Sequence, residues 1–257
     1  MMVEAVGRPL YDFAYIHQID ERLKELAALA EPENWAYATT EAEHSNPVLY
    51  YYFHYTYERV KDQNKIAVTR DNAFACFNTG LATTHQEAIY ALFSKNREPN
   101  REPWRFAKFC RKGENELARF PELPEMATYF DDPSVLVYDQ RLELRVNTQH
   151  IITENRERFP EPFQSMDDYA LGVILKGAID NAKERVRRNY KVAVPQYYRG
   201  QVQLLLPLYL TSPNKADLAL LIQKHEGSYR GATCLSLDMA YNNARQLAKP
   251  DRDWLIP

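Results

Sequence analysis

The sequence lacks the usual signs of disulfides, metal clusters and membrane association. Its three cysteines, Cys76, Cys110 and Cys234, form no CxxC or Cys/His metal-binding pattern. All three lie in apolar runs, so we expect buried thiols in a reducing compartment. No apolar run approaches the roughly 20 residues of a membrane span. The N-terminal MMVEAVGRPLYDF has no basic region followed by an apolar stretch. We therefore expect a cytoplasmic protein without a membrane partner.

Standard catalytic motifs are also absent. The chain has no GxxxxGK[ST], no GxGxxG after a strand, no HExxH and no GxSxG. The adjacent carboxylates Asp131–Asp132 and Asp167–Asp168 do not share a helix face, so they are poor paired catalytic groups. None of the six histidines stands at metal-ligand spacing from another. His150, in RVNTQHIITEN, is a catalytic candidate, with a surface or structural role as the alternative.

Charge and aromatic content limit the kind of ligand. The net charge is −3, so a polyanion site must come from local clustering of Lys and Arg. The 18 tyrosines and 11 phenylalanines suit either base stacking or sheet cores.

The first half of the chain predicts helices followed by an antiparallel meander. Apolar residues at helical spacing predict one helix over 10–30, and Pro47 suits the first position of a second helix over 47–60. Short apolar segments parted by polar turns then predict strands. These segments are 65–69, 73–77, 88–93 and 104–110.

The second half predicts one long amphipathic helix over about 166–190. Ser165 with Asp168 resembles a capping box at its start. Asp238 is expected to be the N-cap of the last helix, and Pro207 predicts an edge, a bulge or a bend. The other predicted elements are strands at 135–139, 202–210, 218–222 and 232–237 and a short helix within 147–158.

This order of elements predicts an α+β fold with a mostly antiparallel sheet. We expect a single domain over 1–257. Its parts are a helical N-terminal part (10–60), a β-rich middle (65–139), the long helix (166–190) and a C-terminal sheet and helix (202–248).

The stretch FNTGL contains Asn78, Thr79 and Gly80 directly after an apolar strand. One interpretation is a simple turn. The other is a ligand-facing turn, because the amide and hydroxyl can hydrogen-bond a ligand and glycine lets a backbone approach closely. We favour the ligand-facing turn.

The stretch KERVRRNYKVAVPQYYRG, residues 183–200, concentrates cations and tyrosines. Cations can neutralise phosphates and tyrosine rings can stack on bases. The alternative is a solvated helix end, where cations favour the C-terminus of the helix. The candidate ligand residues of this stretch are Arg187, Arg188, Asn189, Tyr190, Lys191, Gln196 and Tyr197.

The stretch LDMAYNNAR places Asp238, Tyr241, Asn242 and Arg245 at spacings of three and four. On a helix these residues form one polar face that begins at the N-terminus, where phosphates and carboxylates bind readily. An N-cap with a solvated face is the alternative. Asp238 is thus a second catalytic candidate.

Together with LAEPENWAY, YYFHYTYERVKDQNKIAV, RRNYK…VPQYY and LLLPLYL, these stretches resemble a bacterial domain family of unknown function. The resemblance covers nearly the whole chain. In that family the domain is commonly appended to cold-shock or LOTUS-type winged-helix modules, which implies a role near RNA.

We therefore expect an RNA- or nucleotide-binding domain, with or without phosphoryl or nucleotidyl transfer to process its ligand. Such chemistry would draw a divalent ion such as Mg²⁺ from solution. The alternatives are a non-catalytic protein-interaction module and an enzyme acting on a small nucleotide-derived metabolite. We further predict that Asn78, Thr79, Arg187 and Arg245 line one concavity.

Overall fold

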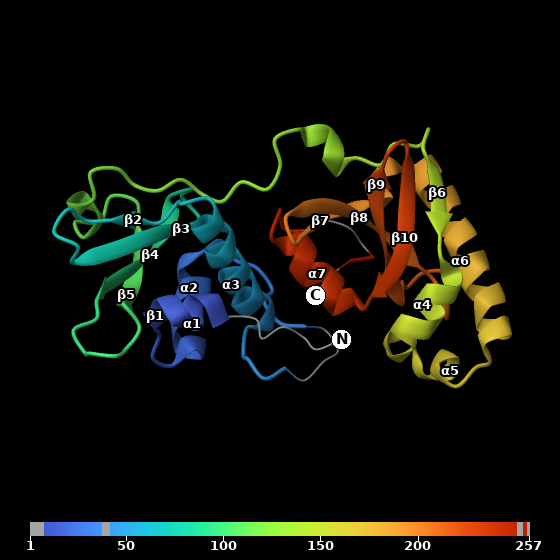
Figure 1. The fold of residues 1–257 in the computed structure, drawn as a ribbon, viewed down its shortest axis with the longest axis horizontal. Helices are drawn as coiled ribbons and strands as arrows, with labels where there is room; N and C mark the ends of the chain where they lie inside the picture. The colour runs from blue at the N-terminus through green and yellow to red at the C-terminus, as the bar shows by residue number, and fades with distance from the viewer. Residues whose placement is uncertain (1–7, 38–41, 251–253, 256–257) are drawn as a thin grey trace. The chain divides into compact units, whose positions relative to one another are not determined.

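The computed structural model describes residues 8–37, 42–250 and 254–255. The chain forms two compact units, Met1–Thr128 and Tyr129–Pro257, each built on its own five-stranded sheet (Figure 1). The predicted class, α+β with mostly antiparallel sheets, is confirmed. That the chain acts as one domain stays a prediction. Within the described residues, no helix is long and apolar enough to cross a membrane.

The first unit begins with three helices, and the single helix predicted over 10–30 is wrong. Residues 14–15 instead pair in parallel with Trp104 and Arg105, and Gln18 takes a left-handed conformation with φ of 51°. The helix predicted from Pro47 is confirmed, with the proline in its first turn. The elements are α1 (Arg8–Phe13), β1 (Ala14–Tyr15), α2 (Ile19–Leu29) and α3 (Pro47–Asp62).

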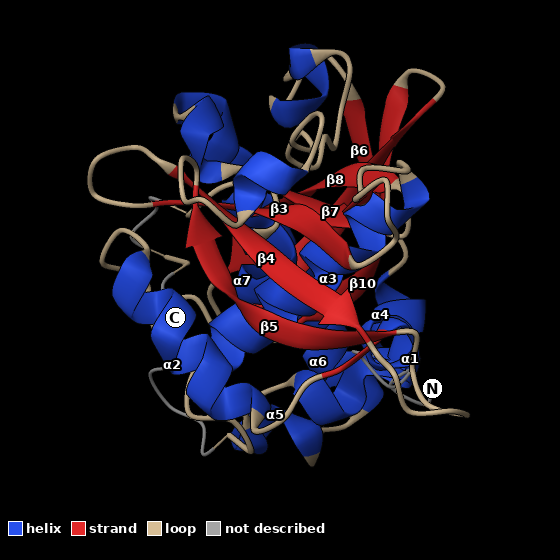
Figure 2. Ribbon diagram, turned by 90° about the vertical axis from the view of Figure 1, so that its left-hand side faces the viewer, coloured by secondary structure: helices blue, strands red, loops and turns tan. Residues whose placement is uncertain are grey.

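The predicted meander forms the first sheet, in the order β1-β5-β4-β3-β2, and Figure 2 shows β3, β4 and β5 side by side. One face packs on α3 through an aromatic core that includes Phe53, Phe77 and Phe93. The other face carries the buried Cys76 and Cys110. Burial raises the pKa of the Cys76 thiol to about 12, as expected for an inert thiol. The strands are β2 (Ala67–Val68), β3 (Phe74–Ala82), β4 (Ala88–Lys95) and β5 (Trp104–Arg111), followed by the short helix η1 (Leu117–Arg119).

The second unit has a sheet in the order β6-β10-β9-β8-β7, with β6 parallel to β10 and the other pairs antiparallel. The strand predicted over 135–139 is wrong, because Pro133 opens a 3₁₀ turn that the Asp132 side chain caps. Its helices are η2 (Pro133–Leu136), α4 (Thr148–Asn155), η3 (Arg156–Arg158), α5 (Glu161–Gln164), α6 (Asp168–Arg188), η4 (Tyr190–Val192) and α7 (Leu237–Arg245). Its strands are β6 (Glu143–Val146), β7 (Val194–Tyr198), β8 (Gln201–Leu208), β9 (Leu218–His225) and β10 (Ser228–Leu235).

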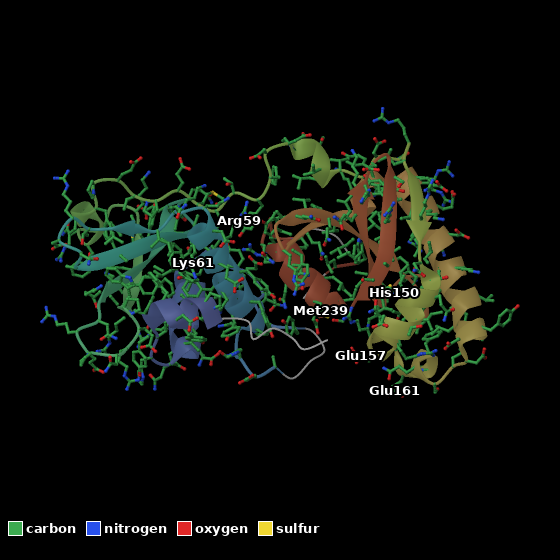
Figure 3. The ribbon with its side chains drawn as sticks, viewed as in Figure 1. Arg59, Lys61, His150, Glu157, Glu161 and Met239 are labelled. Atoms are coloured by element: carbon green, nitrogen blue, oxygen red, sulfur yellow. The ribbon has the colours of Figure 1, made fainter. Side chains whose placement is uncertain are left out.

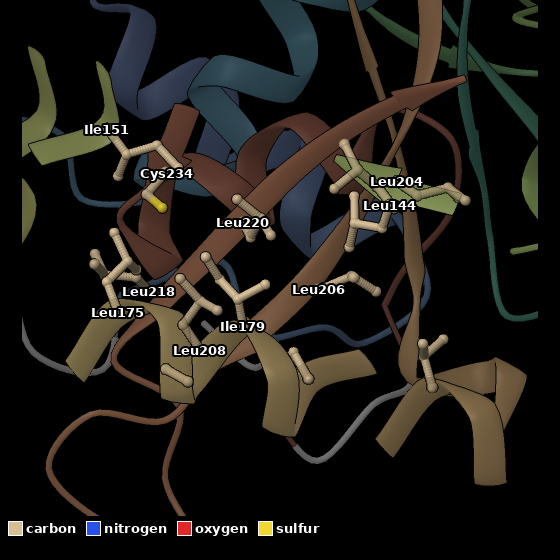
Figure 4. Close-up of a cluster of buried hydrophobic side chains, with 14 of the residues drawn as sticks. Leu144, Ile151, Leu175, Ile179, Leu204, Leu206, Leu208, Leu218, Leu220 and Cys234 are labelled. Atoms are coloured by element: carbon tan, nitrogen blue, oxygen red, sulfur yellow. The ribbon is translucent and has the colours of Figure 1, made fainter. Parts of the chain in front are cut away.

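The two faces of the second sheet carry different helices. Leu204, Leu206 and Leu208 of β8 pack with α4 and α6 in one apolar cluster (Figure 4). Since side chains alternate along a strand, Leu205 belongs to the opposite face, where α7 contacts β7, β9 and β10. Pro207 lies beyond the last residue of β8 that pairs with β7, so that side of β8 is an edge there.

Two helix caps differ from those that the sequence predicts. The N-cap of α6 is Asp167, whose carboxylate accepts hydrogen bonds from the backbone N–H groups of Tyr169 and Ala170. Ser165 does not cap it. The N-cap of α7 is Ser236, so Asp238 lies inside the first helical turn. Both corrections move the cap by two residues, within the usual uncertainty of helix ends.

Candidate functional site

Residues 129–138, named here the strap, cross one face of the second sheet. At one end the ring of Tyr129 packs edge-on against Tyr197 of β7, with 4.8 Å between centroids. At the other end Tyr138 stacks on Tyr229 of β10, also at 4.8 Å. The Tyr229 hydroxyl accepts a hydrogen bond from the Asp139 N–H at 2.9 Å. The strap is therefore anchored over β7 and over β10, and η2 contacts β8 between them.

A groove of about 590 Å³ lies between the strap and the sheet. Between the anchors, residues 130–137 hydrogen-bond only within the strap, as far as the described residues show. The lining from the strap comprises Tyr129, Phe130, Asp131, Asp132, Ser134, Val135 and Val137. The lining from the sheet comprises Gln201, Val202, Gln203, Leu204, Ile222, Gln223, Lys224 and Tyr229. The volume lies within the range of small-molecule sites.

Apolar side chains of the strap are exposed at this groove. Phe130 is 40% exposed, Val135 38% and Val137 46%. Exposed apolar groups are unremarkable singly, but three gathered along one groove are typical of a binding surface.

Charges of both signs border the groove. The Ser134 hydroxyl and N–H hydrogen-bond to Asp132 and lower its pKa, and the Lys224 charge adds to this effect. Arg141 hydrogen-bonds to the neighbouring Asp139 and holds the pKa of that carboxyl at about 2, again with help from Lys224. Lys224 and Asp131 are exposed. The groove thus offers a cation and an anion to a ligand.

Amide side chains connect α7 to this groove. The Asn243 amide donates to Gln196 at 3.3 Å, and Gln196 donates to the groove-lining Gln203 at 2.9 Å. A second pair joins Gln223, as donor, to Gln201. Gln196 is fully buried, so its hydrogen bonds offset the cost of burying an amide. Gln196, a predicted ligand residue, therefore supports the groove from beneath.

The predicted cationic segment lies at the C-terminal end of α6. Arg187 and Arg188 both form ion pairs with Glu184, at 3.2 and 3.9 Å, and remain largely exposed. Asn189 caps η4 through the Lys191 N–H. Among the tyrosines, Tyr190 is 50% exposed whereas Tyr197 is buried.

Arg187 lies within electrostatic reach of the strap. Burial raises the pKa of Tyr138, whereas the Arg187 charge acts to lower it. The Gln140 amide also donates to the Val186 carbonyl at 3.4 Å. The cationic end of α6 and the Tyr138 end of the strap are therefore neighbours.

The FNTGL stretch is not a turn, which corrects the prediction. It lies within β3, where the register with β4 shifts between Asn78 and Ala82, and Gly80 takes a φ of +74°. The Thr79 hydroxyl donates to the Ile89 carbonyl at 2.7 Å, and the Asn78 side chain accepts from the Gly80 N–H at 2.9 Å. These groups stabilise a β-bulge.

Tyr52 of α3 gives a further reason for this glycine. Its hydroxyl donates to the Thr79 carbonyl at 3.0 Å. A Cβ on Gly80 would lie 2.5 Å from that hydroxyl oxygen. Asn78 and Thr79 are buried, so most of the polar groups of this stretch serve the fold.

The polar residues of α7 are more buried than a solvated face would be. Tyr241 is 1% exposed, and Asn242 and Arg245 are each 8% exposed. Asp238 is half-buried, and its neighbour Met239 is exposed on the same helix (Figure 3).

The other catalytic candidate, His150, is exposed on α4 (Figure 3). Its backbone N–H donates to the N-cap Asn147 at 3.1 Å. Over the described ranges, no three His, Cys, Asp or Glu side chains gather as a group that could hold a metal ion.

The predicted site residues are divided between the units. Asn78, Thr79 and Gly80 belong to the first unit, and all the others belong to the second. Their convergence in one concavity stays a prediction. The strap and Lys224 were not among the predicted site residues, since residues 129–134 carry no periodic pattern and Lys224 lies between the predicted strands 218–222 and 232–237.

The sequence profile of a family described as a domain of unknown function (DUF3825) matches residues 26–254. The chain belongs to this family. No curated protein and no solved structure shows a significant match. The matched region of DUF3825 covers the whole strap, the bulge of β3 and the cationic end of α6, so all these features lie within the family domain.

Proposed function

We propose that the second unit of this DUF3825 domain binds single-stranded RNA or nucleotides. The observation that carries the proposal is that the cationic end of α6, where the Val186 carbonyl accepts a hydrogen bond from Gln140, adjoins the Tyr138 end of the strap and its groove of about 590 Å³. Cations supply most of the affinity for phosphates, and an adjoining groove can hold a base.

Two further features support this proposal. Arg187 and Arg188 share one carboxylate, so the segment keeps an excess of positive charge in a chain whose net charge is −3. Tyr190, next to them, is half exposed and offers a ring to a base. The resemblance to domains appended to cold-shock and LOTUS-type modules points to the same class of ligand.

The test measures binding of labelled single-stranded RNA by fluorescence anisotropy over a series of salt concentrations. We expect Arg187→Ala with Lys191→Ala to weaken binding and to flatten the slope of log affinity against log salt. Each lost phosphate contact should reduce a single-strand slope by about 0.7. The double variant should therefore reduce it by about 1.4 if both cations contact phosphate.

A matched control removes two cations from a helix of the first unit. Arg22 and Lys24 of α2 form i,i+3 ion pairs with Glu25 and Glu21, as Arg187 does with Glu184. Arg22→Ala with Lys24→Ala therefore changes the net charge equally. If both double variants change the salt slope equally, the effect is one of global charge and the proposal fails.

The alternatives give different outcomes. A protein-interaction module would bind neither RNA nor nucleotides. An enzyme of nucleotide-derived metabolites would convert small ligands and ignore RNA. Processing by phosphoryl or nucleotidyl transfer is tested by incubating RNA with the protein and Mg²⁺, with Asp238→Asn and His150→Gln as variants. We expect any turnover to fall in a variant whose side chain takes part.

A further inference from the structure

The strap groove has the two surfaces that a flat ligand needs. On one side are the exposed apolar side chains of the strap, Phe130, Val135 and Val137. On the other side the sheet contributes the part-buried Val202, whereas Leu204 and Ile222, which pair across β8 and β9, are already buried in the core. A planar group in the groove would bury apolar area of the strap on one face and of Val202 on the other.

The polar groups at the rim restrict the choice of ligand. Lys224 is exposed and suits a phosphate. Asp131 is exposed and suits a hydroxyl or amino donor, whereas Asp132 is already engaged by Ser134. A ligand that combines a flat ring, hydrogen-bond donors and a phosphate matches all three requirements.

We propose that this groove binds one unpaired nucleotide, with its base between the strap and the sheet and its phosphate at Lys224. The inference rests on the proposed function and deepens it, because it assigns base contact to residues outside the cationic segment. Tyr129 and Tyr138 anchor the strap at both ends, so a base reaches the space between strap and sheet only after it has left the stack of its neighbouring bases.

The experiment compares oligouridine with an abasic oligomer of the same length and phosphate number, by anisotropy at about 0.15 M salt. We expect the abasic oligomer to bind more weakly. Phe130→Ala should weaken oligouridine binding about tenfold, as for loss of one stacking contact, and leave abasic binding unchanged. Lys224→Gln, which replaces an exposed cation of the groove, should weaken the binding of both oligomers because both carry the phosphate that Lys224 contacts.

Tyr169→Ala is the matched control, because Tyr169 is an 83% exposed aromatic residue on α6 that does not line the groove. It should change neither affinity. Competition by uridine 5′-monophosphate separates the two sources of the ligand. If uridine 5′-monophosphate displaces the labelled oligouridine, the groove binds free nucleotides. If only unlabelled oligouridine displaces it, the groove binds a nucleotide within a strand. Either result supports the groove.

Equal binding of the two oligomers, or equal effects of Phe130→Ala and Tyr169→Ala, overturns the inference. If Arg187→Ala with Lys191→Ala still flattens the salt slope in that case, the proposed function stands without the groove. If neither oligomer binds, both proposals fail.

Discussion

His54 of α3 should make the first unit sensitive to acid. Its side chain is fully buried, and its Nδ1 lies 2.8 Å from the Tyr50 carbonyl, to which it donates when neutral. Its Nε2 is buried and has no hydrogen-bond partner among the described residues. Burial lowers the pKa of His54 to about 4, the Tyr50 carbonyl acts to raise it, and the His44 charge lowers it.

The direction of the pH effect follows from the pKa of His54 in the folded and the unfolded chain. The unfolded chain has an ordinary histidine pKa of 6.5, so it takes up the proton before the folded chain does. Stability is therefore complete above about pH 6.5 and falls as the pH drops toward 4. At 1.36 kcal/mol per unit, the difference amounts to about 1.4 kcal/mol at pH 5.5 and about 3 kcal/mol below pH 4.

The assay is native-state hydrogen exchange of α3, which reports opening of the first unit, at pH 7.5, 5.5 and 4.5. His54→Asn is the reference, because its amide can still donate to the Tyr50 carbonyl but does not titrate. Subtracting the variant removes the contribution of the carboxylates. We expect the wild type to lose about 1.4 kcal/mol relative to His54→Asn between pH 7.5 and 5.5. A difference that stays constant over this range would refute the reasoning.

Two smaller predictions concern backbone and caps. Gly80→Ala should cost about 2–3 kcal/mol of unfolding free energy, because it adds strain at positive φ to the clash with Tyr52. Gly200→Ala, with a similar φ of +85° and no atom within 4 Å of its Cβ, should cost less in the same urea titration. Asp167→Ala should lower the stability of the second unit by about 1 kcal/mol, whereas Ser165→Ala should have no effect on thermal unfolding. If the two glycine variants lose equal stability, the clash with Tyr52 does not explain the cost at Gly80. If Asp167→Ala and Ser165→Ala lose equal stability, Asp167 is not the N-cap of α6.

Periodicity predicted most of the elements correctly, because their apolar faces are wide. The meander of the first unit and the long helix α6 follow directly from alternating and 3.6-residue patterns. The break between α1 and α2 did not follow, because Ala14 and Tyr15 are set in a strand by pairing with β5, a contact 90 residues away. Local propensity cannot predict such a tertiary effect.

The strap shows why the groove could not be predicted from the sequence. VLVYD has the composition of a strand, but Pro133 and the cap at Asp132 turn its first residues into a 3₁₀ helix. What holds the segment in place is the pairing of Tyr138 with Tyr229, which lies far along the chain. Tyrosine composition predicted aromatic contacts, but not which rings would be buried as anchors and which would remain exposed.

The two proposed contributions to binding depend differently on salt, which allows them to be separated. Arg187, Arg188 and Lys191 are exposed cations, so their effect should weaken steeply as ionic strength rises. The apolar strap groove should depend little on salt, because burial of apolar area involves no counterion release. At high salt, the preference for oligouridine over the abasic oligomer should therefore persist while the absolute affinity falls. A preference that disappears together with the affinity would assign base contact to the cationic segment, where Tyr190 is the exposed ring.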